Sequence, residues 1–184
     1  IILTVTLLRV KKVRITPKLT AQIGIAIALS LVLNMFKIYR LPQGGSITLG
    51  GMVPILLIAM IYGPEAGFLT GLLYGILDLI LEPYIVHPIQ LLFDYPLPFM
   101  ALGIAGYFKH NKLLGTVVAV FARFIFHFVS GFVFFADYSQ NMGPVLYSLV
   151  YNGSFLAIDG LICLVIIGIL PIDRLRHIAK AQAQ

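Results

Sequence analysis

Six long apolar runs, separated by short polar segments, account for most of this 184-residue chain. Within each run the apolar residues follow one another without the strict alternation that is typical of a half-buried β-strand, so the pattern favours helices. Most of the runs approach the 20 or so residues that a helix needs to cross a bilayer. We therefore predict membrane-spanning helices at residues 19–38, 51–62, 66–81, 89–108, 113–136 and 144–170.

Two of these runs differ from a regular span. Residues 51–62 are too few to cross the hydrocarbon core upright, so we expect this helix to be tilted, buried or incompletely crossing. Residues 89–108 contain Pro96 and Pro98, which predict a kink just after Asp94, because proline removes a helical hydrogen bond. The expected fold class is an all-α membrane protein with six transmembrane helices.

Composition supports a membrane location. Hydrophobic residues make up 60% of the chain and charged residues only 11%, whereas soluble domains carry about 25% charged residues. The formal net charge of +6 does not indicate a nucleic-acid partner, because so apolar a chain has no soluble basic face. The expected partner of this surface is membrane lipid.

The basic residues are distributed unequally between the two sides of the predicted membrane domain. With an even number of spans, both termini and the turn at 109–112 share one side, which holds ten of the thirteen Lys and Arg residues. The positive-inside rule then places the N and C termini in the cytoplasm. We expect residues 1–18 to be an N-terminal extension with a basic flank, 19–171 the six-helix membrane domain, and 172–184 a basic cytoplasmic tail.

Polar residues converge in the outer half of the predicted spans. A carboxylate such as Asp94 costs about 2.5–3.5 kcal/mol to insert into a bilayer, so it needs a partner in the protein or on a ligand. Arg123, His127 and Gly131 recur every four residues and therefore share one helix face. The last span adds Tyr147 and Asn152. This convergence predicts a polar pocket open to the outside, covered by the glycine-rich loop that follows the first span.

Aromatic residues surround the same zone. Aromatic faces beside a carboxylate suit an organic cation, because each cation–π contact contributes roughly 0.5–2 kcal/mol. An anion site would be expected to contain more buried cationic groups than Arg123. The aromatic residues concerned are Tyr74, Tyr84, Tyr95, Phe134, Phe135, Tyr138, Tyr147 and Tyr151.

Each of these residues also has a purely structural interpretation. Asp94 could form an ion pair with Arg123, His127 could be a packing histidine, and Gly131 could allow close helix packing. Asp159, deeper in the last span, has no evident partner in the sequence.

Catalytic and metal-binding motifs are absent from the sequence. It contains no His-Glu-x-x-His, Gly-x-Ser-x-Gly or Walker motif, and its single cysteine and scattered histidines argue against a metal cluster. We expect no cofactor, no metal and no enzymatic activity.

The first span carries a small-xxx-small pattern, Gly24-Ile-Ala-Ile-Ala28. Such faces let helices approach closely in a membrane, either within the protein or against a partner.

Several motifs resemble the thiamine-specific substrate-binding component (S-component) of energy-coupling factor (ECF) transporters, the ThiT/YuaJ family. Residues 41–50, with Pro42, Gln43, Gly44 and Gly45, are followed by Met52-Val-Pro-Ile in the family's manner. The other matching segments are 73–77, 83–90, 93–96, 123–131 and 147–153. The resemblance extends from about residue 19 to 171.

The resemblance implies a six-helix S-component in the plasma membrane of a bacterium. Members of the family bind thiamine with high affinity from outside and dock on a transmembrane coupling subunit that carries two ATPase subunits. Docking would use Gly24 and Ala28, and the loop at 42–45 would close over the pocket. Thiamine is then the ligand, ATP hydrolysis belongs to the partners, and no nucleic acid is involved.

The resemblance also assigns roles to individual residues. Asp94 matches the acidic residue that faces the aminopyrimidine of thiamine, although it is one methylene shorter than the Glu of some relatives. The other matches are polar contacts from Tyr95, His127, Tyr147 and Asn152, an aromatic wall from Tyr74, Tyr84 and Phe135, a close backbone approach at Gly131, and a basic position at Arg123. This chain contains no tryptophan, and Tyr74 and Phe135 stand where we would expect one.

Three alternatives remain from the residues alone. The first is an S-component for another vitamin or a thiamine precursor. The second is a stand-alone ion-coupled carrier that uses Asp94, Arg123 and His127 as a proton relay. The third is an intramembrane enzyme.

Overall fold

A short, almost entirely buried helix lies at the centre of the fold. In the computed structural model, which describes residues 16–181, this helix is α3 (Val53–Tyr62), and Ile55, Leu56 and Ala59 within it are fully buried. Ten residues span about 15 Å, roughly half of the hydrocarbon thickness. The prediction of a short, buried helix in this region is confirmed.

Among residues 16–181, five helical segments around α3 are long and apolar enough to cross a membrane. The all-α membrane fold class is confirmed, but the predicted count of six transmembrane helices is not exact, since α3 is too short to be counted among the full spans. The outward-facing side chains of the long helices, such as Ile80, Phe121 and Ile169, are exposed and form an apolar surface suited to lipid. The segments are α2 (Pro17–Met35), α4 (Pro64–Leu81), Pro88–Tyr107, α7 (Lys112–Phe134) and α8 (Pro144–Ile169).

The segment Pro88–Tyr107 is broken next to Asp94, as the two prolines predicted. It consists of α5 (Pro88–Asp94), α6 (Pro96–Ala101) and the 3-10 helix η2 (Leu102–Tyr107). The break packs against α4 at Gly75, where an added Cβ would lie 2.7 Å from the Cα of Pro96. Close approach of the backbones thus holds Asp94 at a helix end inside the bundle.

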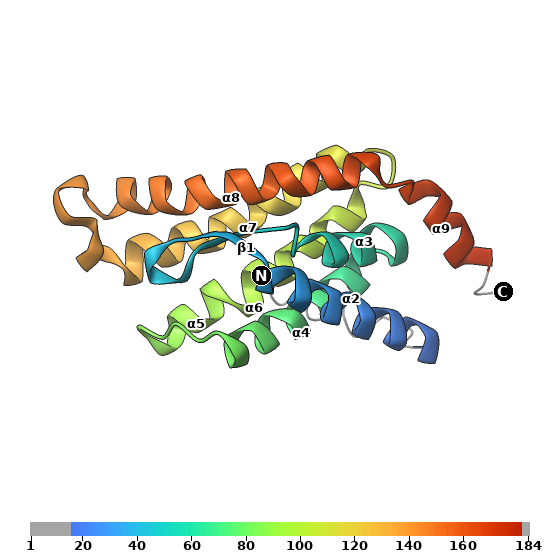
Figure 1. Cartoon of the computed structure of the whole chain (residues 1–184), viewed down its shortest axis with the longest axis horizontal. Coiled ribbons are helices and arrows are strands. Elements are labelled where there is room, and N and C mark those ends of the chain that lie inside the picture. The colour runs from blue at the N-terminus through green and yellow to red at the C-terminus, as the bar shows by residue number, and fades with distance from the viewer. Residues whose placement is uncertain (1–15, 182–184) are drawn as a thin grey trace.

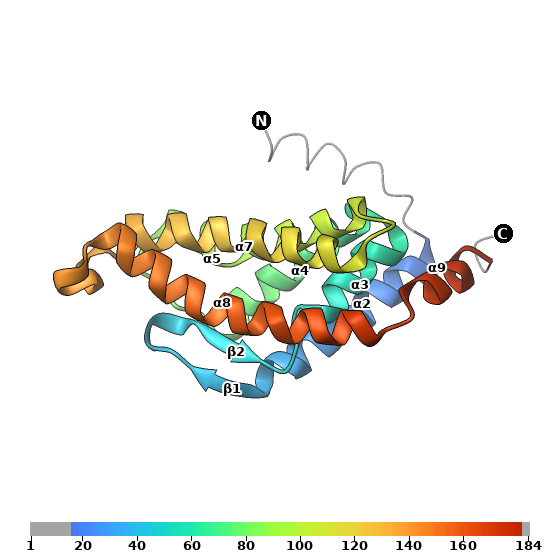
Figure 2. The same ribbon diagram turned by 90° about the horizontal axis from the view of Figure 1, so that it is seen from above.

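The glycine-rich loop forms a β-hairpin, which the sequence analysis did not predict. Strand β1 (Lys37–Arg40) pairs antiparallel with β2 (Ser46–Thr48) across η1 (Pro42–Gly44). The turn uses left-handed backbone at Gln43 (φ 46°) and at Gly44 (φ 91°). Figure 2 shows the hairpin lying alongside α8.

The hairpin and α3 together return the chain toward the end of the bundle where α2 begins. In Figure 1 the start of α2 and the C-terminal helix α9 (Ile172–Ala181) lie at one end, and η3 (Ala136–Met142) lies at the other. Arg176 ties α9 to the bundle by donating hydrogen bonds to the carbonyls of Met60 and Lys109. Both described ends are therefore on one side, as predicted. The N-terminal extension at residues 1–15 lies outside the described residues.

Candidate functional site

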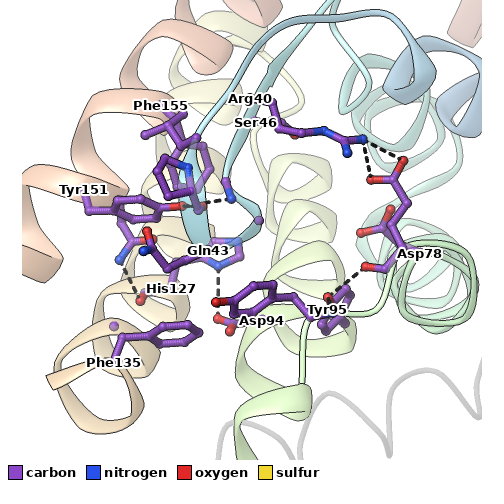
Figure 3. Close-up of a pocket in the computed structure, with 18 of the residues that line it drawn as sticks. Arg40, Gln43, Ser46, Asp78, Asp94, Tyr95, His127, Phe135, Tyr151 and Phe155 are labelled. Carbon is purple, nitrogen blue, oxygen red and sulfur yellow. Dashed lines mark hydrogen bonds and ion pairs between the residues drawn. The ribbon is translucent and has the colours of Figure 1, made fainter. Parts of the chain in front are cut away.

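A cavity of about 460 Å³ lies between the hairpin, α4, α5, α7 and α8. This volume is within the range of small-molecule sites in proteins, about 300–1,000 Å³. Nine of the ten predicted ligand contacts line it, together with the loop residues 42–45 (Figure 3). These nine are Tyr84, Asp94, Tyr95, Arg123, His127, Gly131, Phe135, Tyr147 and Asn152.

Tyr74 is the predicted contact that does not line the cavity. Its side chain is only 1% exposed and packs edge-on against Phe99, with the ring centroids 4.5 Å apart. Phe99 does line the cavity. Tyr74 therefore supports the wall from behind, and in this structure it is not part of the lining.

Asp94 belongs to a chain of polar side chains. Gln90 donates from Nε2 to Asp94 Oδ2 (2.6 Å), and His127 Nδ1 lies 3.4 Å from Asp94 Oδ1. On the far side of the imidazole, Arg123 Nε donates to His127 Nε2 (3.3 Å). Because Nε2 accepts a hydrogen bond, this order fits the neutral His127 tautomer, which carries its proton on Nδ1 and donates it to Asp94.

The direct ion pair between Asp94 and Arg123, an alternative from the sequence, is not present. The guanidinium of Arg123 instead lies over the ring of Phe99, 4.1 Å from its centroid. Within residues 16–181 the carboxylate contacts Gln90 and His127, and no Lys or Arg forms an ion pair with it. Asp94 thus lines the cavity without a directly bound cationic side chain.

Aromatic rings make up part of the cavity lining. Tyr84 stacks on Phe135 with centroids 6.0 Å apart, and Phe135 contacts Tyr138. The hydrogen bond between the hydroxyls of Tyr84 and Tyr138 (3.5 Å), aided by partial burial, raises the pKa of Tyr84 to about 12. Tyr147 and Tyr151 of α8 also line the cavity and stack on each other. Such walls suit a flat, cationic ring system.

Tyr95 and Asn152 line the cavity but already have protein partners. The Tyr95 hydroxyl accepts from Tyr84 N (2.6 Å) and donates to Glu82 O (3.0 Å), so it holds the loop between α4 and α5. The Asn152 amide nitrogen donates to His127 O and to Ser148. The side-chain carbonyl oxygen of Asn152 therefore remains to accept a hydrogen bond from a ligand.

Gly131 brings α7 and α8 close together. An added Cβ would clash with Ser148 Oγ and lie 2.7 Å from Asn152 Nδ2. The packing interpretation of this glycine is therefore correct, and its place in the cavity lining is compatible with a ligand contact as well.

The hairpin borders the cavity and is hydrogen-bonded to α8. Tyr151 Oη accepts from Gly45 N (3.0 Å) and donates to Pro42 O (2.8 Å), and Tyr147 Oη donates to Gln43 Oε1 (3.3 Å). At the base of the hairpin, Thr48 donates from N and Oγ1 to Asp159 Oδ1 (3.0 and 2.9 Å). Asp159, for which the sequence offered no partner, thus holds the base of the hairpin.

The ligand contacts chosen from the sequence leave out a polar wall on the α4 side of the cavity. Asp78 accepts a hydrogen bond from Asn34 Nδ2 (3.0 Å), and Glu82 forms ion pairs with Lys37 and Arg40 of β1. Asp78 and Glu82 are four residues apart in the sequence, a spacing that could have indicated one helix face. Gln90 was missed as well, although it precedes Asp94 by the same interval. All six residues line the cavity.

Comparison with known proteins decides the family. Residues 20–179 match the family model described as "Thiamine transporter protein (Thia_YuaJ)". The chain belongs to this thiamine transporter family. Thiamine transporter ThiT of Bacillus subtilis (strain 168) is 36% identical over 163 residues, which are 79% of this chain and 83% of that protein. ThiT of Lacticaseibacillus paracasei is 28% identical over 141 residues, covering 65% and 70%.

A solved structure supports the same family assignment. ThiT from Listeria monocytogenes superposes with a TM-score of 0.76 at 28% identity, covering 83% of this chain and 92% of that chain. The similarity spans nearly the whole membrane domain, so the resemblance seen in the sequence motifs is confirmed at the level of family and fold. The relatives are transporters, in agreement with the expectation that the chain is not an enzyme.

Proposed function

We propose that this protein is the high-affinity thiamine-binding S-component of an ECF importer, with residues 19–171 as its binding domain. In this proposal it lies in a bacterial plasma membrane, captures thiamine from outside and releases it inward when docked on a transmembrane coupling subunit and two ATPases. One observation carries the proposal. A cavity of suitable size, in a member of the thiamine transporter family, presents the Asp94 carboxylate, to which no Lys or Arg of the described part of the chain is directly bound.

Thiamine has three features that this cavity can match. Its thiazolium ring carries a permanent positive charge, which suits the stacked rings of Tyr84 and Phe135. Its aminopyrimidine can donate a hydrogen bond to Asp94, and Asn152 offers a further acceptor. Hydrogen bonds to a charged group contribute about 1.5–3 kcal/mol each.

Titration with thiamine tests the role of Asp94. We expect Asp94→Asn to weaken thiamine binding by roughly 10- to 150-fold, which corresponds to the loss of about 1.5–3 kcal/mol. Asp173→Asn makes the same chemical change on α9, at the opposite end of the bundle, and should leave the affinity unchanged. Equal affinities for Asp94→Asn and the unmodified protein would show that this carboxylate does not bind the vitamin.

Gly24 and Ala28 form the proposed docking face for the coupling subunit. Both residues are exposed on α2, and a Cβ added at Gly24 would meet no atom within 4 Å. Packing inside the described chain therefore makes no use of this small-residue face. A partner helix could approach it closely, as small-xxx-small faces allow.

Gly24→Leu tests the docking proposal. The substitution should leave thiamine binding by the isolated protein unchanged, because the added side chain points away from the bundle, and should abolish ATP-dependent uptake with the coupling module. Lost binding in the isolated protein would contradict the assignment of this face to docking.

An ion-coupled carrier is the second candidate, because Asp94, His127 and Arg123 do form a continuous hydrogen-bonded chain. Uptake of thiamine by the purified protein alone, driven by a pH gradient without ATPases, would favour the carrier over the S-component.

A further inference from the structure

Gln90 has an unusual place for an amide side chain, because it is almost completely buried beside the ligand cavity. Its side chain is 1% exposed and lies in the first turn of α5. A buried polar group of this kind is stable only when its hydrogen bonds are satisfied. Its partners therefore indicate what the residue does.

Both polar ends of the Gln90 amide are satisfied. The Oε1 atom accepts from Val86 N (3.1 Å), while Nε2 donates to Tyr84 O (3.1 Å) and to Asp94 Oδ2 (2.6 Å). A flipped amide would turn its oxygen toward two acceptors and its NH₂ group toward a donor. The three contacts together therefore fix one orientation of the amide.

The contact with Asp94 determines which carboxylate oxygen is available to a ligand. Oδ2 is held by Gln90, and Oδ1 is the oxygen near His127 Nδ1. A short aspartate side chain held at two points cannot rotate freely, so its charge faces the cavity in one direction. Preorganised acceptors of this kind distinguish ligands by the position of their donors.

The contact with Tyr84 couples the carboxylate to the aromatic wall. The Tyr84 backbone is held on both sides, since its carbonyl accepts from Gln90 and its N–H donates to Tyr95 Oη. The Tyr84 ring stacks on Phe135 at the cavity. One amide thus sets the relative positions of the acidic group and of one aromatic ring.

We propose that Gln90 is a positioning residue for ligand selectivity, which orients Asp94 so that Oδ1 accepts a hydrogen bond from the exocyclic amino group of an aminopyrimidine. The inference rests on the proposed binding of thiamine. It adds a prediction that thiamine binding alone does not make: selectivity for the amino group depends on a residue that need not touch the ligand.

The test compares thiamine with oxythiamine, in which the amino group is replaced by an oxygen. Both dissociation constants are measured by titration of the same purified full-length preparation. The ratio of the two constants is unaffected by any fraction of protein that fails to fold.

Gln90→Met keeps the length of the side chain without its polar atoms, and Gln90→Glu replaces the two donated hydrogens by an acceptor. Thr116→Val is the matched control, because Thr116 is also fully buried but bonds only to the Lys112 carbonyl of its own helix.

We expect the unmodified protein to prefer thiamine. Gln90→Met should reduce that preference by about tenfold or more, Gln90→Glu should reduce it at least as far, and Thr116→Val should leave it unchanged. In an Asp94→Asn background, Gln90→Met should change the ratio by less than about twofold, because the oriented charge is already gone.

Three results would overturn the inference. If both ligands weaken equally in Gln90→Met, the residue has only a structural role. If the unmodified protein binds thiamine and oxythiamine alike, the amino group is not recognised, although thiamine binding stands. If the unmodified protein binds neither ligand, the proposed function itself fails, and the inference fails with it.

Discussion

Retention of the ligand by the hairpin can be tested at a single oxygen atom. The Tyr151 hydroxyl makes both of its bonds to the hairpin, one from Gly45 N (3.0 Å) and one to Pro42 O (2.8 Å). Tyr151→Phe removes both bonds and keeps the ring, which packs against Phe155. Ser154→Ala is the matched control, because it removes a hydroxyl from the same helix that donates to the Tyr151 carbonyl within α8 and does not bond to the hairpin.

The number of bonds sets the expected size of each effect. An intramolecular hydrogen bond contributes about 0.5–1.5 kcal/mol net, since water replaces it when the hairpin opens. Tyr151→Phe should therefore weaken the closed state by about 1–3 kcal/mol, or roughly 5- to 150-fold in affinity. Ser154→Ala should leave the affinity unchanged, because its hydroxyl bonds within α8.

Dissociation of radiolabelled thiamine after dilution into unlabelled ligand is a suitable assay, because the chain contains no tryptophan to report binding by fluorescence. The loss should appear mainly as faster dissociation, as is usual for substitutions at a binding interface. Equal dissociation rates for the two variants would refute the reasoning. So would slower association with unchanged dissociation, because the hairpin would then control entry and not retention.

Two further predictions concern stability. Gly131→Ala should lower the melting temperature and the thiamine affinity, because the added methyl group clashes with Ser148 and Asn152. The loss of stability should be about 1–3 kcal/mol, and adding Ser148→Ala should restore part of it. Asp159→Ala should destabilise the protein by about 2–5 kcal/mol in thermal unfolding, because Thr48 loses two hydrogen bonds to one buried oxygen. Asp159→Asn should destabilise it clearly less, because the amide retains an oxygen at that position. Equal losses for the two Asp159 variants would contradict the role of that oxygen.

The sequence by itself determined the features that depend on local chemistry and helical periodicity. Apolar runs defined the membrane segments, Pro96 located the break after Asp94, and the basic residues grouped both ends of the described chain on one side. The four-residue spacing of Arg123 and His127 placed them on one face of α7, where they bond to each other. These features follow from the helix repeat and from proline geometry, which require no knowledge of neighbouring segments.

The tertiary structure alone decided which faces meet. Thr48 and Asp159 are 111 positions apart, and no local pattern relates them. The family resemblance likewise assigned Tyr74 to the aromatic wall of the pocket. In the structure α4 packs closely against the broken segment at Gly75, and the Tyr74 ring lies behind Phe99, out of the cavity lining. A helix repeat fixes angles between residues of one helix, whereas the rotation of that helix in the bundle depends on packing against all of its neighbours.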